Sequence, residues 1–148
     1  MRRTNALDLT VPCCVVLLVV HLLLRDGYGS LAPLQWFTPV PLIVLSVIEM
    51  GLIRRVRGAI GHDPQTKAMT AIAIARCTAL GKASAIAAAA VAGAAAAMLI
   101  RVVPLFSTVD AARHDTEVSG VVLAAAVLLA ASGLLLERAT VIPTDPKN

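Results

Sequence analysis

The fold is decided by one polar stretch, RRVRGAIGHDPQTKAMTAIAIARCTALGK, which runs from Arg54 to Lys82. It separates two pairs of apolar segments and carries the basic residues Arg54, Arg55, Arg57, Lys67, Arg76 and Lys82. Basic residues beside a membrane span tend to stay in the cytoplasm. The stretch therefore predicts which way the chain faces, with this basic loop inside the cell.

The composition favours lipid over water as the solvent for most of the chain. Hydrophobic residues make up 58% of the 148 residues and charged residues 15%, whereas soluble domains average roughly 45–50% and about 25%. The net charge of +4 does not point to nucleic acid, because the charges flank apolar runs and only four aromatic residues are present for base stacking. We therefore expect no nucleic-acid partner.

Four apolar runs predict membrane-spanning helices, at about residues 9–24, 34–53, 83–100 and 118–136. The fourth run holds nineteen residues without a charge, which is the clearest span signal. The first run holds only sixteen residues, which rise about 24 Å as a helix. The predicted fold class is all-α: a single integral membrane four-helix bundle, followed by a polar C-terminal tail over residues 137–148.

The first run also has the features of a secretory signal peptide, because it is short and follows a basic start. Ser30-Leu31-Ala32 is similar to a cleavage site. Against cleavage, Pro33 would follow the cut, Asp8 weakens the basic region, and three further apolar runs come later. We therefore expect this run to remain as the first span.

The third predicted helix is long. Asp63 is expected to be its N-cap residue, with Pro64 at the first helical position. We expect the helix to continue to Val103. Its first part would lie at the inner membrane surface and its second part, residues 83–100, would span the membrane. The polar segment from Arg101 to Glu117 is expected to be an outer loop.

The orientation follows from the distribution of lysine and arginine. With both termini inside, the outer side holds three of these residues, Arg25, Arg101 and Arg113, and the other ten lie inside. The reverse orientation would put the larger number outside, so the sequence predicts a plasma-membrane protein with both termini in the cytoplasm.

The third span is rich in alanine, which supplies eleven of the fifteen residues from Ala83 to Ala97. Small residues recur at four-residue steps, at Ala85, Ala89, Gly93 and Ala97, and such a ridge lets two helix backbones approach closely. The ridge packs either against another helix of the same chain, which we favour, or against a second copy in a homodimer.

One charge, Glu49, lies inside the second span, four residues before its inner end. An ionisable side chain inside a membrane indicates a functional site with a charged partner, and Lys82 and Arg76 at the start of the third span are the candidates for an intramembrane charge pair. Alternatively, Glu49 reaches headgroup water and Lys82 snorkels to the interface, which needs no function. We favour this second interpretation.

No other constellation indicates chemistry. Two of the three cysteines are adjacent, and none has CxxC spacing. This pattern does not indicate a disulfide framework. The three histidines fall in one span and in loops on opposite sides, where no two share a metal. The sequence contains no glycine-rich phosphate loop and no nucleophile with its base. We therefore expect no enzyme, no metal and no cofactor.

Several short motifs carry a family resemblance. They are the MRRT start, the segment Pro33-Leu34-Gln35-Trp36 with Pro39, the stretch from Asp63-Pro64 to Gly81-Lys82-Ala83-Ser84-Ala85, and the close Leu136-Glu137-Arg138 with Ile142-Pro143. With these motifs the chain resembles a family of small membrane proteins of high-GC Gram-positive bacteria, the domain of unknown function 3180 family. The resemblance implies four spans in the plasma membrane and no particular activity. The chain departs from the family in its alanine-rich third span.

The leading functional hypothesis is a non-catalytic accessory or scaffold component whose inner face holds a membrane or cytosolic protein, or anionic lipid. The expected docking residues are Arg54, Arg55, Arg57, Lys67, Glu137 and Arg138. The alternative is a small transporter or transporter subunit in which Glu49 and Lys82 line the path. A membrane enzyme is the weakest candidate, because four mostly apolar spans furnish little polar cavity.

Overall fold

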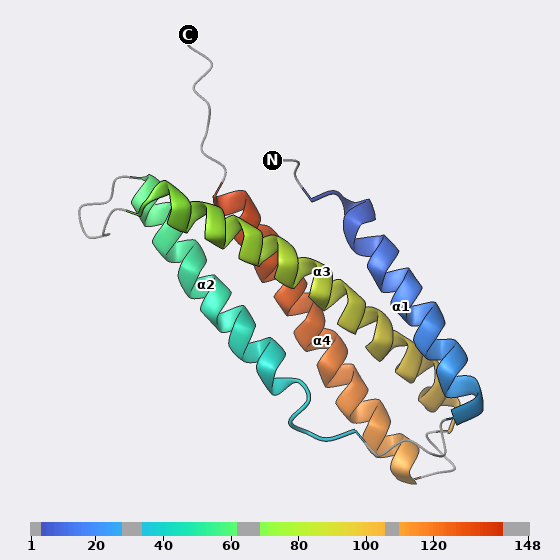
Figure 1. Cartoon of the computed structure of the whole chain (residues 1–148). Coiled ribbons are helices and arrows are strands. Elements are labelled where there is room, and N and C mark those ends of the chain that lie inside the picture. Colours follow the sequence, from blue (N-terminus) through green and yellow to red (C-terminus); the bar gives the residue numbers. More distant parts are fainter. Residues whose placement is uncertain (1–3, 28–33, 62–68, 106–109, 141–148) are drawn as a thin grey trace.

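Within the residues that it describes, the computed structural model contains four long α-helices and one short 3₁₀ helix (Figure 1). It describes residues 4–27, 34–61, 69–105 and 110–140. The elements are α1 (Ala6–Gly27), α2 (Val40–Ile60), α3 (Ala71–Val102), η2 (Val103–Leu105) and α4 (Asp110–Ala139). No strand occurs within these described ranges, which confirms the all-α fold class.

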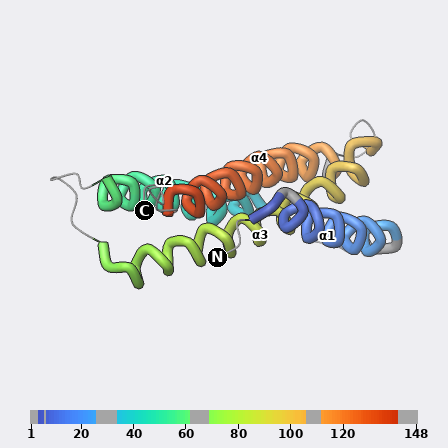
Figure 2. Tube along the Cα trace, turned by 90° about the horizontal axis from the view of Figure 1, so that it is seen from above, coloured from blue at the N-terminus to red at the C-terminus, as the bar shows by residue number. Residues whose placement is uncertain are grey.

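The centre of the molecule is the pair α3 and α4, which pack along much of their length (Figures 1 and 2). Helix α1 packs on α3, and α2 packs mainly on α4. Across the described residues α1 and α2 make no contact with each other. The arrangement is therefore more open than a closed four-helix bundle, because its two outer helices lie against different members of the central pair.

The contacts between α1 and α3 fix their relative direction. Near the start of α1, Pro12 lines a groove together with Ile86 of α3. Near its end, Leu24 packs in a cluster with Met98 of α3. Residue numbers rise together along both helices, so α1 and α3 run parallel.

The other two helices run the opposite way. Gly133 of α4 meets Gly81 of α3, and the earlier α4 residue Val118 packs with the later α3 residue Ala95. Helix α2 runs in the same direction as α4, since Val56 near the end of α2 packs with Leu136 near the end of α4. The chain therefore travels the length of the molecule through α2 before α3 begins.

The central helices approach most closely at a pair of glycines. A Cβ atom added to Gly81 would lie 2.7 Å from the carbonyl oxygen of Gly133, and one added to Gly133 would lie 2.6 Å from the carbonyl oxygen of Gly81. Both distances are shorter than real Cβ contacts. Only glycine at both positions allows the two backbones to touch.

The alanine ridge is buried inside the chain. Ala85 and Ala97 have no exposed surface, and Ala89 and Gly93 are also buried. A Cβ atom at Gly93 would overlap the backbone of Cys13 in α1. The ridge therefore packs within the monomer, and none of its four members is exposed to a second copy.

Helix α2 begins six residues later than the predicted span 34–53. The segment before it forms a turn, and Pro39 is the N-cap residue of a helix that starts at Val40. Pro39 and Pro41 cause the difference, because proline lacks the backbone N–H that an earlier helical start would need and is tolerated only in the first turn.

Helix α3 also begins later than the sequence predicts. Met69 and Thr70 are not helical, and the Thr70 hydroxyl accepts a hydrogen bond of 3.3 Å from the backbone N–H of Ala73. Threonine is a favoured N-cap residue, so the helix starts at Ala71. Asp63 and Pro64, the predicted start, lie outside the described residues.

The predicted outer loop from Arg101 to Glu117 is largely helical. Arg101 belongs to the last turn of α3, and α4 begins at Asp110 instead of Val118. Within the described part of this segment, Arg113 and Glu117 lie 3.9 Å apart at i,i+4 spacing on α4, and opposite charges at this spacing stabilise a helix.

In the part of the chain that the structure describes, three helical segments are long and apolar enough to cross a membrane: Leu7–Arg25, Ala71–Leu105 and Ala112–Ala139. Helix α2 falls outside this set because Glu49 and three arginines lie within its 21 residues. Even so, α1 and α2 expose many large apolar side chains, among them Leu23 at 69% and Val47 at 67%. Apolar surface on this scale marks contact with lipid or with another protein.

The glycine contact gives a first prediction. Gly133→Ala inserts a methyl group against the Gly81 backbone and should lower the free energy of unfolding by about 1–3 kcal/mol, the usual cost of overpacking. The measurement is the thermal unfolding midpoint of the purified protein in detergent.

Gly120→Ala, in the same helix, is the matched control because nothing lies within 4 Å of a Cβ atom there. This control should be neutral or slightly stabilising, since alanine is the better helix former. Equal midpoints for the two variants would contradict the backbone contact.

Candidate functional site

Glu49 is fully buried where α2 packs on α4. Its Oε2 accepts a hydrogen bond of 2.6 Å from the Ser132 hydroxyl, which also lies 3.0 Å from the carbonyl oxygen of Leu129. The other carboxyl oxygen, Oε1, has no hydrogen-bond partner. A buried carboxyl group with one hydrogen bond is costly, so this contact selects one position of α2 along α4.

The two cations expected near Glu49 lie elsewhere. Lys82 is partly buried beside α1, and Arg76 is exposed near the start of α3. Among the described residues neither cation forms an ion pair with Glu49. The reason is the helix arrangement: α2 packs chiefly on α4, whereas both cations belong to α3.

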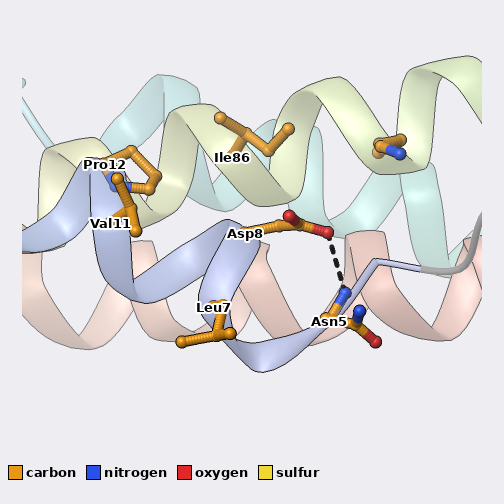
Figure 3. Close-up of a pocket in the computed structure, with 7 residues that line it drawn as sticks. Asn5, Leu7, Asp8, Val11, Pro12 and Ile86 are labelled. Atoms are coloured by element: carbon orange, nitrogen blue, oxygen red, sulfur yellow. Dashed lines mark hydrogen bonds between the residues drawn. The ribbon is translucent and has the colours of Figure 1, made fainter.

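Lys82 lines a groove of about 530 Å³ between the start of α1 and α3 (Figure 3). Asn5, Asp8 and Pro12 line its other side. The backbone N–H of Asn5 donates a 2.9 Å hydrogen bond to Asp8 Oδ2, which caps the helix start. Because Pro12 has no N–H, the Asp8 carbonyl lacks its usual intrahelical donor. The groove therefore combines one ammonium group with acceptors at the start of α1.

Glu137, expected as a docking residue, is buried. Its Oε1 accepts a hydrogen bond of 2.8 Å from the backbone N–H of Thr4, and its Oε2 has no partner. Beside it, the Thr78 hydroxyl donates to the Thr140 hydroxyl at 2.8 Å. These bonds join the segment before α1, the start of α3 and the end of α4, so Glu137 holds the fold together at this end.

The remaining cations form an exposed set, which we name the basic tip: Arg54, Arg55, Arg57, Arg76 and Arg138. They lie at the end of α2, the start of α3 and the end of α4, which gather toward one end of the molecule (Figure 1). None of the five forms an ion pair with another described residue. Lys67, the sixth expected cation, lies outside the described residues.

At the opposite end, α4 holds the segment that leads into α2. The backbone N–H of Leu34 donates a 3.1 Å hydrogen bond to Asp115 Oδ1, and its carbonyl oxygen lies 3.0 Å from His114 Nε2. The Trp36 ring meets the His114 ring edge-on, with 5.6 Å between centroids. This cluster was not predicted, because His114 and Asp115 were expected in a loop; acidic residues ahead of an apolar run are the signal that could have placed them on a helix.

The side chains that could ligate a metal are dispersed over the described residues. Within residues 4–27, 34–61, 69–105 and 110–140, no three histidine, cysteine or carboxylate side chains gather where they could hold a metal ion. The three cysteines are free thiols.

Taken together, the chain is an all-α protein with membrane-length apolar helices, two buried glutamates and a cluster of exposed arginines. It belongs to the DUF3180 family, described as a protein of unknown function, whose model matches residues 9–144. This match confirms the family resemblance seen in the sequence. Neither a curated protein nor a solved structure matches the chain.

The geometry predicts that Glu49 acts as a hydrogen-bond acceptor for Ser132. Glu49→Gln keeps an acceptor, so its free energy of unfolding should lie within about 0.5 kcal/mol of that of the original protein. Glu49→Ala should lower the free energy of unfolding by about 2–3 kcal/mol, because it leaves a cavity and removes the hydrogen bond. Thermal unfolding in detergent measures both.

Met50→Ala, at the exposed neighbouring position on α2, is the control and should change little. If Glu49→Gln destabilises as strongly as Glu49→Ala, the negative charge itself is required and the structural role is wrong.

Proposed function

We propose that this chain is a four-span protein of the plasma membrane, with both termini in the cytoplasm, that acts as a non-catalytic scaffold. Its basic tip would hold an acidic cytosolic partner protein at the membrane. The observation that carries the proposal is the set of five exposed arginines at one end of the helices, none of them paired with a described carboxylate.

The helix directions support four crossings. Because α1 and α3 run parallel, the chain must return along the molecule between them, and α2 is that return. The apolar part of α2, Val40–Ile53, is about 21 Å long as a helix, which is shorter than the roughly 30 Å hydrocarbon core. Snorkelling of Arg54 and local thinning of the bilayer accommodate such a deficit, and the exposed Trp36 and Phe37 suit the outer interface.

The shape of the basic tip suits a docking surface. Helix α1 begins beside Lys82, eleven residues after the start of α3, so the first three turns of α3 extend beyond α1. Arg76 lies about 9 Å along the helix axis from Lys82. Arg57 of α2 and Arg76 therefore stand where a cytosolic surface can reach them, and unpaired surface charges speed the encounter with an oppositely charged partner.

The transporter alternative has less support. A path lined by Glu49 and Lys82 requires both side chains on one surface, whereas Glu49 faces Ser132 of α4 and Lys82 lines the groove beside α1. The close contact of α3 with α4 lies between these two positions. A scaffold requires no such path.

The topology predicts the side of each connection. Reporter fusions after Gly29 and Thr108 should be extracytoplasmic, and fusions after Gln65 and Asn148 should be cytoplasmic. If α2 does not cross the membrane, the Gly29 and Gln65 fusions will instead report the same side, which would contradict the four-span placement.

Docking predicts that the arginines are needed to retain a partner. A variant with Arg54, Arg55 and Arg57 each changed to Gln should lose most of the protein crosslinked to the chain in native membranes, by about tenfold or more. The captured protein should be acidic, and its yield should fall between about 0.1 M and 1 M salt, where the screening length drops from about 10 Å to about 3 Å.

The control changes Arg25 and Arg101 to Gln, because both are exposed cations at the opposite end. This control should retain the partner. The scaffold proposal is wrong if no protein is crosslinked, or if the triple variant captures the same protein in equal yield.

A further inference from the structure

A second cavity lies between α1, α3, α4 and the segment that precedes α2, at the end opposite the basic tip. Its volume is about 350 Å³, and its lining includes Leu24 of α1, Leu34 before α2, Ala95 and Met98 of α3, and Ser119 and Val122 of α4. The lining is apolar except for the hydroxyls of Thr38 and Ser119. The Thr38 hydroxyl donates a hydrogen bond to the carbonyl oxygen of Gln35. The Ser119 hydroxyl is therefore the polar group of the lining whose hydrogen bonding remains to be explained.

Ser119 differs from the other helical hydroxyls that the structure describes. A serine or threonine inside a helix normally donates to a carbonyl three or four residues earlier, as Ser46, Ser84 and Thr116 do. Thr78 and Ser132 donate to a side chain across a helix contact instead. Ser119 has no exposed surface and its hydroxyl has no hydrogen-bond partner. A buried unpaired hydroxyl is costly, and an acceptor within the cavity would remove that cost.

The surroundings indicate which acceptor. Ser119 lies one helical turn inward from Asp115, so in the proposed membrane placement it is just inside the outer interface, where the ester carbonyls of lipids lie. Two exposed cations, Arg25 and Arg101, occupy the last turns of α1 and α3 at the same end. Helices α1 and α2 make no contact with each other. The cavity is therefore not closed by an α1–α2 contact.

We propose that this cavity binds one acyl chain of an outer-leaflet glycerophospholipid. The ester carbonyl of the lipid accepts a hydrogen bond from Ser119 Oγ, and its phosphate lies near Arg25 and Arg101. The volume is at the lower end of the roughly 300–1,000 Å³ range of ligand pockets, so it holds one chain while the rest of the lipid stays in the bilayer. The site rests on the four-span placement proposed above and is independent of the partner protein.

The charges at the mouth favour a phospholipid over other apolar membrane molecules. A quinone or an isoprenoid alcohol could also place an oxygen near Ser119, but neither carries the negative charge that two arginines attract. A phospholipid supplies both the acceptor and the anion.

The test is retention of lipid by the full-length protein, extracted from its native membrane in mild detergent and weighed by native mass spectrometry. The original chain should retain one glycerophospholipid per protein. Ser119→Ala removes the donor and should lower retention roughly fivefold, in line with the loss of one hydrogen bond. Ala95→Leu fills the cavity and should lower retention more than tenfold.

Ser46→Ala is the matched control, because Ser46 is a helical serine that lies outside this cavity and bonds to its own helix. It should retain lipid like the original chain. Circular dichroism checks the helix content of each variant. If Ala95→Leu does not fold, Ser119→Ala still decides the matter because it adds no bulk.

The lipid site is wrong if the original chain retains no lipid, if both cavity variants retain as much as Ser46→Ala, or if the retained molecule lacks a phosphate ester. These results leave the scaffold proposal intact. A protein that stays in water without detergent would instead overturn the membrane placement, and the lipid site with it.

Discussion

The structure depends on the direct contact of two helix backbones, α3 and α4, at Gly81 and Gly133. In lipid, apolar side chains gain nothing by leaving one hydrocarbon surface for another, so helices associate through close packing and hydrogen bonds. A helix made mostly of alanine has little side-chain surface to offer. It compensates by approaching its neighbours at backbone distance, on α4 at Gly81 and on α1 at Gly93. The two outer helices take their positions from this central pair.

Two buried carboxyl groups determine how the outer segments attach. Glu49 bonds α2 to Ser132 of α4, and Glu137 bonds the backbone of Thr4, before α1, to the end of α4. In each case one oxygen is satisfied across a helix contact and the other is not. Polar groups of this kind specify position more than they add stability, because sliding the helix leaves both oxygens unpaired in an apolar setting.

The sequence predicted the elements more successfully than their contacts. Apolar runs located all four helices, and the small-residue ridge at Ala85 and Gly93 predicted close packing within the chain. The helix starts were missed because local caps decide them: Pro39 delays α2, and Thr70 begins α3.

The sites were harder to predict because they depend on which helices are neighbours. Lys82 and Arg76 were candidate partners of Glu49 because they begin the span that follows it in the sequence. In the structure α2 packs chiefly on α4, which gives Glu49 the uncharged partner Ser132. Glu137 looked like a surface residue beside Arg138, and nothing in its own sequence context indicates that Thr4, 133 positions earlier, reaches it.

The absence of contact between α1 and α2 has a consequence for biosynthesis. Only 6% of the apolar segment of α1 is buried within the protein, against 39% and 44% for those of α3 and α4. In the proposed four-span placement, the first hairpin would leave the insertion machinery before the helices on which its members pack. There α1 would reside in the bilayer alone until α3 arrives, and α2 would do so until α4 arrives. The attachment of α2 would then be a late event, which needs the last quarter of the polypeptide.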